Sequence, residues 1–467
     1  MKIKKPNKIV AGVEIIDTSS EGKAVAKIDD LVAFVEGAVP GDICTIQISR
    51  IKKKFAEAKL ITLEKPSSER IDAICSHFGT CGGCKWQHLN YDSQLKYKQK
   101  HVSDALKRIG KVEVRNFKPI IGAKEIYNYR NKLEFTFSAK KWLTKEEISS
   151  GKEFNRNALG FHIPGLFDKI IDIETCYLQK DPSNAIRNEV RDFALKNEFS
   201  FFDIKEKHGF LRNLLIRTTN KGELMVLFSF FREEKENREE LLNHVKNKFL
   251  QITSLLYIIN PKGNETFHDL DVHCYHGRDY IIEEMEGLQF KIGPKSFFQT
   301  NSDQAYELYK VAREFAGLSG NELVYDLYTG TGSIACFIAS KAKKVIGIEY
   351  VEAAIEDAKE NAKINDINNA FFYAGDMKDL LTKDFIDKNG MPDVIITDPP
   401  RAGMHEDVIK VINEIKAKKI VYVSCNPSTQ ARDLAALSGN YKVSAIQPVD
   451  MFPQTHHIET VALLELQ

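Results

Sequence analysis

A cysteine lies directly before Asn-Pro at the end of a predicted strand, in the stretch YVSCNPST (422–429). Cysteine is among the residue types most often buried, so Cys425 is either a small core residue or a reactive thiol. A thiolate can attack an electron-poor carbon and form a covalent intermediate. Further along the chain, Glu459 in MFPQTHHIETVALL (451–464) offers a carboxylate that can remove a proton in the same reaction.

A second motif predicts a cofactor pocket. The stretch VYDLYTGTGSIA (324–335) ends a predicted strand and opens a predicted helix with the spacing Gly-x-Gly-x-x-Ala. An acid, Glu349, follows at the end of the next predicted strand, where the ribose partner of a dinucleotide-type pocket belongs. By itself this motif fits NAD and S-adenosylmethionine equally well.

The stretch DVIITDPPRAGM (393–404) favours S-adenosylmethionine. An Asp-Pro-Pro loop after the fourth strand is typical of methyl-transferring enzymes, because proline stiffens the loop and Asp398 can accept hydrogen bonds beside substrate or cofactor. Enzymes that methylate amino groups carry an aromatic residue after this motif, whereas this chain has Arg401. We therefore interpret the methyl acceptor as a carbon.

The thiol makes C5 of a pyrimidine the best candidate carbon. C5 alone is a weak nucleophile, but a thiolate that adds to C6 pushes electron density onto C5, which then takes the methyl group. A base must next remove the C5 proton so that the thiol can leave. Cys425 and Glu459 supply these two groups, which favours the reactive thiol over a core residue.

Four further cysteines form a candidate metal site. Cys75, Cys81 and Cys84 lie within ten residues, and Cys176 follows alone. Eight cysteines in a cytosolic chain of this length do not indicate disulfides. Four thiolates fit a structural zinc ion and an iron–sulfur cluster equally well.

The elements that must position these residues fall into three predicted parts. Residues 1–63 alternate apolar and polar positions, which predicts an OB-like β-barrel. Residues 64–290 mix strands and helices in a central α+β domain, although its helix at 93–109 can pack on the catalytic domain. Residues 291–467 alternate apolar strands with helices, which predicts an α/β fold, a doubly wound Rossmann-like methyltransferase domain.

Charge patterning indicates a nucleic-acid partner. The net charge is only +1, but residues 92–124 hold nine Lys or Arg against three acids. In the predicted barrel, three lysines at 52–54 lie beside Phe55, a combination typical of single-stranded nucleic-acid binding. With no apolar run long enough for a membrane span and no apolar signal core at the N-terminus, we expect a cytoplasmic protein without a membrane partner.

Seven motifs, in order, resemble those of the RNA uracil-C5 methyltransferase family, which makes 5-methyluridine: CSHFGTCGGCKWQHLNYDSQLKYKQ, YRNKLEF, GPKSFFQTN, DLYTGTGSIA, TDPPRAGM, SCNPSTQARDL and FPQTHHIET. The predicted barrel resembles a TRAM domain, an RNA-binding module. The resemblance spans almost the whole chain. It implies Cys425 as nucleophile and Glu459 as base. The further implied sites are cofactor contacts at Gln299, Tyr328, Glu349, Asp376 and Asp398, substrate contacts at Phe297 and Arg130, and a 4Fe-4S cluster on Cys75, Cys81, Cys84 and Cys176.

The resemblance implies a monomer that methylates a uridine of RNA, and the barrel and cysteines together favour 23S ribosomal RNA. A transfer-RNA uridine is the alternative substrate. RNA cytosine-C5 methylation is disfavoured because such enzymes carry a second cysteine in the loop that here reads Asp-Pro-Pro-Arg. A salt bridge is the alternative role of Arg130. The sequence QTHH (454–457) departs from the family pattern, which predicts a less rigid loop before Glu459 and leaves His456 without a role.

Overall fold

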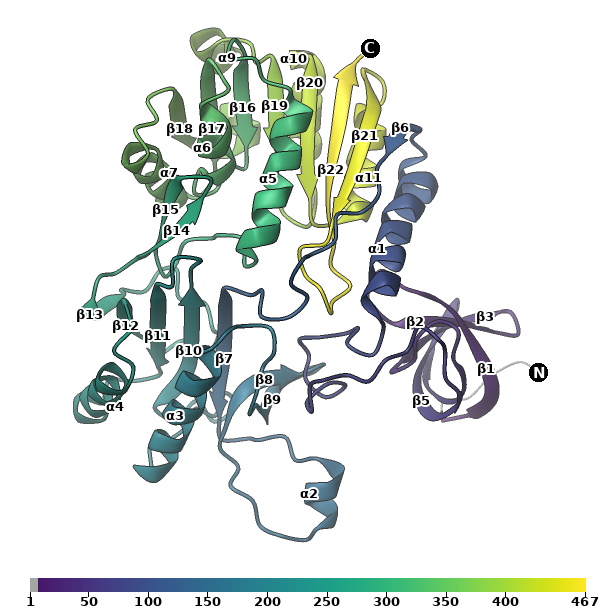
Figure 1. Cartoon of the computed structure of the whole chain (residues 1–467), viewed down its shortest axis with the longest axis vertical. Helices are drawn as coiled ribbons and strands as arrows, with labels where there is room; N and C mark the ends of the chain where they lie inside the picture. The colour runs from purple at the N-terminus through teal and green to yellow at the C-terminus, as the bar shows by residue number, and fades with distance from the viewer. Residues whose placement is uncertain (1–6) are drawn as a thin grey trace.

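The computed structural model describes residues 7–467, so residues 1–6 of the predicted barrel lie outside the described part. Five strands close into a barrel in the order β1-β2-β3-β5-β4, at the right of Figure 1. They are β1 (Ile9–Thr18), β2 (Ala24–Ile28), β3 (Leu31–Glu36), β4 (Ile43–Ile51) and β5 (Phe55–Lys65). Alternate residues of these strands point inward and form a separate apolar core, as the alternating sequence predicts.

The central domain is built on a seven-stranded sheet with the order β13-β12-β11-β10-β7-β8-β9, antiparallel except for the β11–β12 pair. Its strands are β7 (Lys132–Ser138), β8 (Ala158–Ile163), β9 (Leu166–Asp172), β10 (Leu211–Thr218), β11 (Leu224–Phe230), β12 (Ser254–Ile259) and β13 (His273–Gly277). Helices α3 (Ser183–Lys196) and α4 (Lys235–Lys248) cover one face, where the apolar residues of β7 and β10 meet them. The short helix α2 (Lys145–Ser149) lies in an excursion at the bottom of Figure 1.

The catalytic domain has an eight-stranded sheet with the order β18-β17-β16-β19-β20-β22-β21-β6. Its later strands are β16 (Leu323–Leu327), β17 (Lys344–Glu349), β18 (Ala370–Ala374), β19 (Val394–Thr397), β20 (Lys419–Ser424), β21 (Tyr441–Val449) and β22 (Glu459–Leu466). The later helices are α5 (Ser302–Ala316), α6 (Ser333–Ala339), α7 (Glu352–Ile364), α8 (Met377–Leu380), α9 (Lys383–Asn389), α10 (Glu406–Ile415) and α11 (Pro427–Leu437). Two apolar cores lie on opposite faces of this sheet, because its central strands are apolar on both sides. This is the predicted doubly wound fold.

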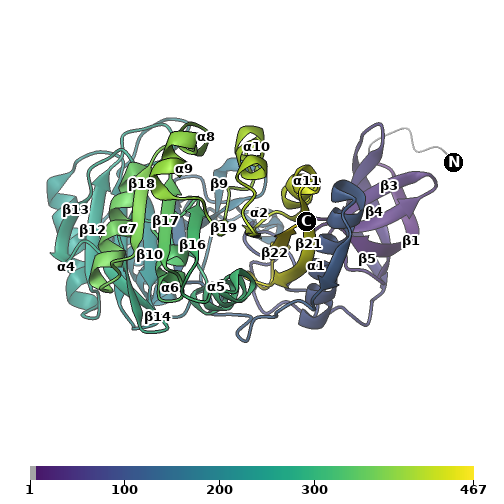
Figure 2. The ribbon, with the colours of Figure 1, turned by 90° about the horizontal axis from the view of Figure 1, so that it is seen from above.

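A segment that precedes the central sheet in sequence packs against the catalytic domain. Helix α1 (Tyr91–Ala105) continues through a π-helical turn (Leu106–Gly110) into β6 (Val114–Phe117). Val102 and Leu106 belong to the apolar core under β20 and β22. Strand β6 pairs in parallel with β21 and ends the sheet. Figures 1 and 2 show α1 between the barrel and β21, so this helix links the two domains.

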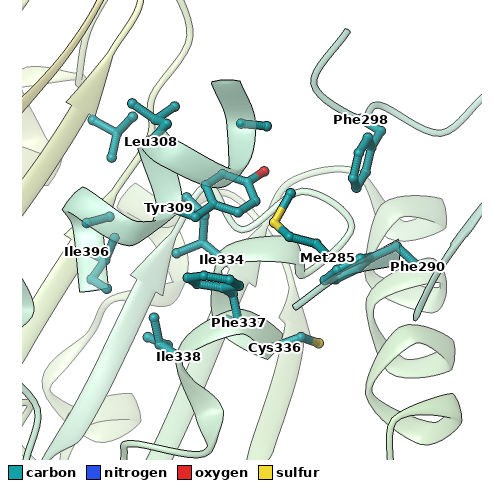
Figure 3. Close-up of a cluster of buried hydrophobic side chains, with 14 of the residues drawn as sticks. Met285, Phe290, Phe298, Leu308, Tyr309, Ile334, Cys336, Phe337, Ile338 and Ile396 are labelled. Carbon is teal, nitrogen blue, oxygen red and sulfur yellow. The ribbon is translucent and has the colours of Figure 1, made fainter. Parts of the chain in front are cut away.

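A two-stranded hairpin connects the central domain to the catalytic core. It consists of β14 (Ile281–Met285) and β15 (Leu288–Ile292). Met285 and Phe290 from this hairpin reach the same core as Ile334 and Phe337 from α6 (Figure 3). The chain that leaves the hairpin therefore enters the catalytic domain at a defined place. Among residues 7–467, no helix has the length and apolar character needed to cross a membrane.

Candidate active site

The predicted nucleophile and base lie opposite each other at one end of two paired strands. Strands β20 and β22 are antiparallel, and Ser424 pairs with Thr460. Cys425 directly follows Ser424, and Glu459 directly precedes Thr460. Residues opposite each other in an antiparallel pair have Cβ atoms about 5 Å apart. The register thus lets the thiol and the carboxyl group act on one bound base.

Buried polar contacts hold this strand end. The Thr460 hydroxyl donates to Gln430 Oε1 at 2.6 Å, and Gln430 Nε2 donates to the Tyr422 carbonyl oxygen at 2.9 Å. Gln430 lies on α11 and is buried, as is Thr460. Because satisfied buried networks rigidify their surroundings, the two strand ends keep a fixed spacing.

The loop after the nucleophile is tied to the Asp-Pro-Pro loop. Asn426 caps α11 with its side-chain oxygen, and its Nδ2 donates to the Arg401 carbonyl oxygen at 3.0 Å. Asp433, fully buried on α11, accepts hydrogen bonds from Met404 N at 2.8 Å and from Tyr422 OH at 2.7 Å. The segments 398–404 and 424–433 therefore form one unit.

Two carboxyl groups, Glu459 and Asp398, lie close to the thiol, and a third, Asp326, lies close to Asp398. Burial raises the pKa of Asp326 to about 7. Burial, with a smaller contribution from Asp326, raises the pKa of Asp398 to about 7, although Asp398 is only half-buried by its accessible surface. Burial, with Asp398 adding to it, raises the pKa of Glu459 well above its usual range. Because like charges oppose each other's ionisation, the three groups do not all carry charge at neutral pH.

The same surroundings keep the thiol protonated. Burial first, then Glu459 and Asp398, raise the pKa of Cys425 to about 11, while Arg401 lowers it. Only the thiolate attacks, so the free protein holds a nucleophile that must lose its proton before it reacts.

The glycine loop and Glu349 form a cofactor-type pocket edge. Gly330 and Gly332 have φ of 55° and 74°, left-handed values that glycine adopts without strain. At Gly332 a Cβ would lie 2.8 Å from Ala358 Cβ, so a larger residue would clash. Glu349, at the end of β17, accepts from Gly330 N at 3.2 Å and from Val351 N at 3.0 Å. This edge has the acid and the close backbone that a nucleoside-containing cofactor needs.

The other predicted cofactor residues end neighbouring strands. Tyr328 follows β16 with a φ of 62° and is partly buried. Burial, and next the charge of Asp376, raise the pKa of the Tyr328 hydroxyl to about 12. Asp376 follows β18 and caps α8 through Lys378 N. The structure therefore brings Tyr328 and Asp376 to the same sheet edge as Glu349.

The segment with Phe297 and Gln299 lies between the central domain and the glycine loop. Thr331 donates from its hydroxyl to the Phe297 carbonyl oxygen at 3.3 Å. From the central domain, Asn131 Nδ2 donates to the Gln299 carbonyl oxygen at 2.9 Å. Gln299 is buried, whereas the Phe297 side chain is 66% exposed. An aromatic ring so exposed beside a cofactor pocket is available for stacking on a nucleobase.

Arg130 has contacts outside the two paired strands that carry Cys425 and Glu459. It lines the cavity of the four cysteines, and its guanidinium carbon lies 5.2 Å from the ring centre of Phe452. Phe452 belongs to the segment that leads to Glu459. Arg130 therefore bridges the cysteine cavity and that segment.

The four predicted ligand cysteines share one cavity. Cys75, Cys81, Cys84 and Cys176 all line a space of about 200 Å³, and all are free thiols. The remaining walls include apolar side chains from both neighbouring segments. Within residues 7–467, however, no group of three or more His, Cys, Asp or Glu side chains is arranged to hold a metal ion. The iron–sulfur cluster and the alternative zinc ion both stay predictions.

Several residues that shape this site were not predicted from the sequence. Asp433 joins the two loops described above, and Arg217, 1% exposed, donates to the carbonyl oxygens of Gly293 and Ser296 before Phe297. Asp433 stands in the motif SCNPSTQARDL, and Arg217 directly follows the apolar run 214–216 of β10, where a buried charge needs a partner. That contrast was the available signal.

Comparison with protein families gives two matches. The family described as tRNA (Uracil-5-)-methyltransferase matches residues 211–467, and the TRAM domain matches residues 10–61. The first match spans β10 to β13 of the central sheet and residues 291–467 of the catalytic domain, and the second spans most of the barrel.

Comparison with individual proteins agrees with these matches. An uncharacterized RNA methyltransferase of Bacteroides thetaiotaomicron is 59% identical over 453 residues, which cover 96% of this chain and 100% of the relative. Another from Chlorobaculum tepidum is 38% identical over 97% of this chain and 95% of the relative. The crystal structure of Pyrococcus abyssi tRNA (uracil-54, C5)-methyltransferase with S-adenosyl-L-homocysteine is 29% identical, with a TM-score of 0.75, over 97% of this chain and all of that chain.

Proposed function

The chain belongs to the family of RNA uracil-C5 methyltransferases, and on that premise we propose that it methylates C5 of a specific uridine in 23S ribosomal RNA through a covalent Cys425–C6 adduct. It is an S-adenosylmethionine-dependent enzyme. One observation gives the strongest support for the covalent route. The β20–β22 register sets Cys425 and Glu459 opposite each other beside Asp398, as a reaction with one nucleophile and one base on the same ring requires.

Each residue has a defined step in the proposed reaction. Once the cofactor is bound, the Cys425 thiol and the Glu459 carboxylic acid each give their proton to water. The Cys425 sulfur then bonds to C6, which breaks the C5–C6 π bond and places the electron pair on C5 and the conjugated O4. S-adenosylmethionine supplies an electrophilic methyl group on a sulfonium. C5 bonds to that methyl carbon, and the sulfonium carbon–sulfur bond breaks. The Glu459 carboxylate then takes the C5 proton, the C5–C6 double bond re-forms, and the Cys425 thiolate leaves.

The raised pKa values fit this order of events. Cys425 and Glu459 are both held in their neutral forms in the free protein. A cation placed between them lowers both pKa values, because it stabilises the thiolate and the carboxylate. Binding of the cationic cofactor therefore favours the forms of both groups that react.

We propose ribosomal RNA as the substrate because the chain combines an RNA-binding barrel with a four-cysteine site. The solved relative from Pyrococcus abyssi acts on uracil-54 of transfer RNA, so transfer RNA is the second candidate. Cytosine-C5 methylation has less support, since Arg401 and not a cysteine follows Asp-Pro-Pro. Cytoplasmic location and a monomeric state belong to the same proposal.

The four cysteines would hold a 4Fe-4S cluster in this proposal. Four thiols around a shared cavity, with apolar walls, suit a group that has volume of its own and takes four thiolate ligands. The methyl transfer itself needs no electron, so the cluster would supply structural cross-linking between residues 75–84 and Cys176. Anaerobically purified protein should contain about four iron atoms per chain, and Cys81→Ser should lose them. Stoichiometric zinc without iron would overturn this assignment.

The experiment that tests the function is methylation of defined RNA. Purified protein, labelled S-adenosylmethionine and RNA from a strain that lacks the enzyme should yield 5-methyluridine in 23S ribosomal RNA fragments. Nucleoside analysis distinguishes 5-methyluridine from 5-methylcytidine, and separated transfer RNA tests the second substrate. Label confined to transfer RNA would overturn the ribosomal substrate, and label on cytosine would overturn the uridine assignment.

A further inference from the structure

The residues from Asp450 to Ile458, here named the base loop, lead directly into Glu459. In Figure 1 this yellow segment hangs below the catalytic sheet, between α1 and the central domain. Glu459 is the first residue of β22 and pairs with Val449 of β21, so the sheet holds its backbone on one side and the base loop holds it on the other. What holds the base loop therefore bears on proton removal.

A buried ion pair holds the start of the base loop. Lys98 of α1 donates to Asp450 Oδ1 at 2.6 Å and to the Phe452 carbonyl oxygen at 3.0 Å. The side chains of Lys98 and Asp450 are both fully buried. Tyr91, two helical turns before Lys98 in α1, donates to Asp450 Oδ2 at 2.9 Å. All these contacts come from residues that precede the first strand of the central sheet.

The middle of the base loop is fastened to the end of the cysteine segment. The backbone N–H groups of Lys85 and Trp86, directly after Cys84, both donate to the Gln454 carbonyl oxygen, at 2.9 and 3.0 Å. Gln94, fully buried, accepts from Gln454 N at 2.9 Å and donates to Gln454 Oε1 at 3.0 Å. Gln94 Nε2 also lies 3.0 Å from the Trp86 carbonyl oxygen. One side chain thus joins the cysteine segment, α1 and the base loop.

Two further contacts reach the base loop. Tyr129, just before β7 in the central domain, donates to the Pro453 carbonyl oxygen at 2.9 Å. From the barrel, the β1–β2 turn approaches so closely that a Cβ on Gly22 would lie 3.1 Å from His456 Cβ. Trp86 Nε1 also donates to the Gly22 carbonyl oxygen at 3.0 Å. Barrel, cysteine segment, α1 and central domain therefore all converge on one loop.

We propose that Gln94, Lys98 and Tyr129 are positioning residues for Glu459, through which the N-terminal part of the chain controls proton removal in the last step of the reaction. This inference rests on the proposed function, because it requires Glu459 to be the base. It also gives the cysteine site a role: the segment that ends at Cys84 presents two backbone donors to Gln454. A loss of order in that segment would displace the base loop and leave Cys425 in place.

The proposal predicts a defect in one step only. Proton transfer demands hydrogen-bond reach between base and proton, so a small displacement of Glu459 slows it. Addition of Cys425 and transfer of the methyl group precede that step and do not use Glu459. Variants of the positioning residues should therefore form the methylated enzyme–RNA adduct normally and release it slowly.

Two substrates separate these steps. With 5-fluorouridine RNA, C5 carries no proton and the adduct is trapped after methyl transfer, so the trapping rate does not involve Glu459. With the natural RNA, the accumulated adduct that survives a denaturing gel reports slow release. We expect Gln94→Leu and the milder Tyr129→Phe to trap 5-fluorouridine RNA at the wild-type rate. On natural RNA we expect release to slow by about tenfold in Gln94→Leu and about threefold in Tyr129→Phe. These factors are a fraction of the full contribution of a general base.

Matched controls exclude a general loss of stability. Tyr441 is buried and donates one hydrogen bond, to the Ala417 carbonyl oxygen at 3.1 Å, so Tyr441→Phe matches Tyr129→Phe. Gln179 is buried and donates to the Ile216 carbonyl oxygen at 3.1 Å, so Gln179→Leu matches Gln94→Leu. Neither control residue contacts the base loop through these bonds, and neither variant should accumulate adduct.

Glu459→Gln separates this inference from the proposed function. If Glu459→Gln accumulates methylated adduct but Gln94→Leu and Tyr129→Phe slow trapping and release equally, the positioning role is wrong and the function stands. The positioning role would also be overturned if the control variants accumulated as much adduct as Gln94→Leu and Tyr129→Phe. If Glu459→Gln turns over like the wild type, the base assignment itself fails.

Discussion

Cys425 and Glu459 face each other, yet different parts of the chain hold them. The contacts around Cys425 come from residues 401–460: Gln430, Asn426 and Asp433 bind loops and strands of the same domain. The base loop before Glu459 is bound at its first residues by Asn301, the N-cap of α5, and by Gln304 of α5. Its other hydrogen bonds described above come from residues 85–129, more than 300 positions earlier in the chain. The nucleophile is thus a local construction, whereas the base depends on tertiary contacts.

This difference has a chemical meaning. A nucleophile held within one domain is in place whenever that domain is folded. A base held by the barrel, the cysteine segment and α1 is in place only when those parts are ordered together. The steps of the reaction can therefore be disturbed separately, by variants on the nucleophile side or on the base side.

The largest expected effect is on the nucleophile side. Cys425→Ala removes the atom that activates C5, so methylation should fall by about a thousandfold or more. Trapping by 5-fluorouridine RNA should vanish, while cofactor and RNA binding remain. Gel analysis of labelled RNA measures both methylation and trapping. If Cys425→Ala still methylates, the thiol is a core residue.

Glu459→Gln should produce the opposite signature. The thiol adds and the methyl is transferred, but the C5 proton stays, so turnover should fall by about 10² to 10⁴. A methyl-labelled protein–RNA species should then survive denaturing electrophoresis of the natural RNA. Cys425→Ala/Glu459→Gln, which cannot form this species, is the control. Loss of the adduct in Glu459→Gln alone would show that this residue acts before methyl transfer.

The pH dependence should follow the thiol. Since the pKa of Cys425 is raised to about 11, its thiolate fraction grows by up to about tenfold per pH unit between pH 7 and 9. The trapping rate with 5-fluorouridine RNA should therefore rise with pH in this range. Asp398 ionises near pH 7 and its negative charge opposes ionisation of the thiol, so the slope should be shallower at the lower end.

Glu459→Gln serves as the control for this pH profile, because trapping does not use the base. Its trapping rate should still rise with pH and should not fall below that of the wild type, because loss of the Glu459 charge lowers the pKa of the Cys425 thiol. A trapping rate that is flat from pH 7 to 9 would show that Cys425 is already ionised in the complex with cofactor and RNA.

Asp433→Asn should weaken the nucleophile side alone. The substitution replaces an acceptor oxygen with a donor beside Met404 N and Tyr422 OH, and a buried group left unpaired costs about 1–3 kcal/mol. We expect trapping to slow by about tenfold if the cost falls on the loop geometry, without accumulation of adduct on natural RNA. Asp407→Asn, on the exposed start of α10, is the control. Adduct accumulation in Asp433→Asn would contradict the separation of the two sides.

The smallest effect concerns RNA affinity. Lys52, Lys53 and Lys54 are exposed, and Lys52 Nζ lies 5.0 Å from the ring centre of Phe55. Replacing all three with Ala should weaken RNA binding severalfold and reduce its logarithmic salt slope by up to about three. Filter binding across salt concentrations measures this, with a triple Ala variant of exposed catalytic-domain lysines as control. An unchanged slope would remove these lysines from the RNA interface.

Local patterns in the sequence were enough to predict the barrel, the doubly wound domain and its glycine loop. Alternation of period two, apolar strands between helices, and Gly330-x-Gly332 are properties of neighbouring residues, so no tertiary information is needed to read them. The likeness of YVSCNPST and of the motif around Glu459 to a known family led to the prediction that Cys425 and Glu459 are the reacting pair. The strand order and the TRAM match agree with these predictions.

Only the tertiary structure decided how those residues are held. That Cys425 faces Glu459 follows from the register of β20 and β22, and a register is a relation between two segments. That Lys98 is a buried partner of Asp450 could not be read from a Lys-rich helix, where each lysine has the same local surroundings in sequence. The physical reason is that burial of a charge depends on what lies across the contact, here 352 residues away, and pairs so distant leave no periodic trace in the chain.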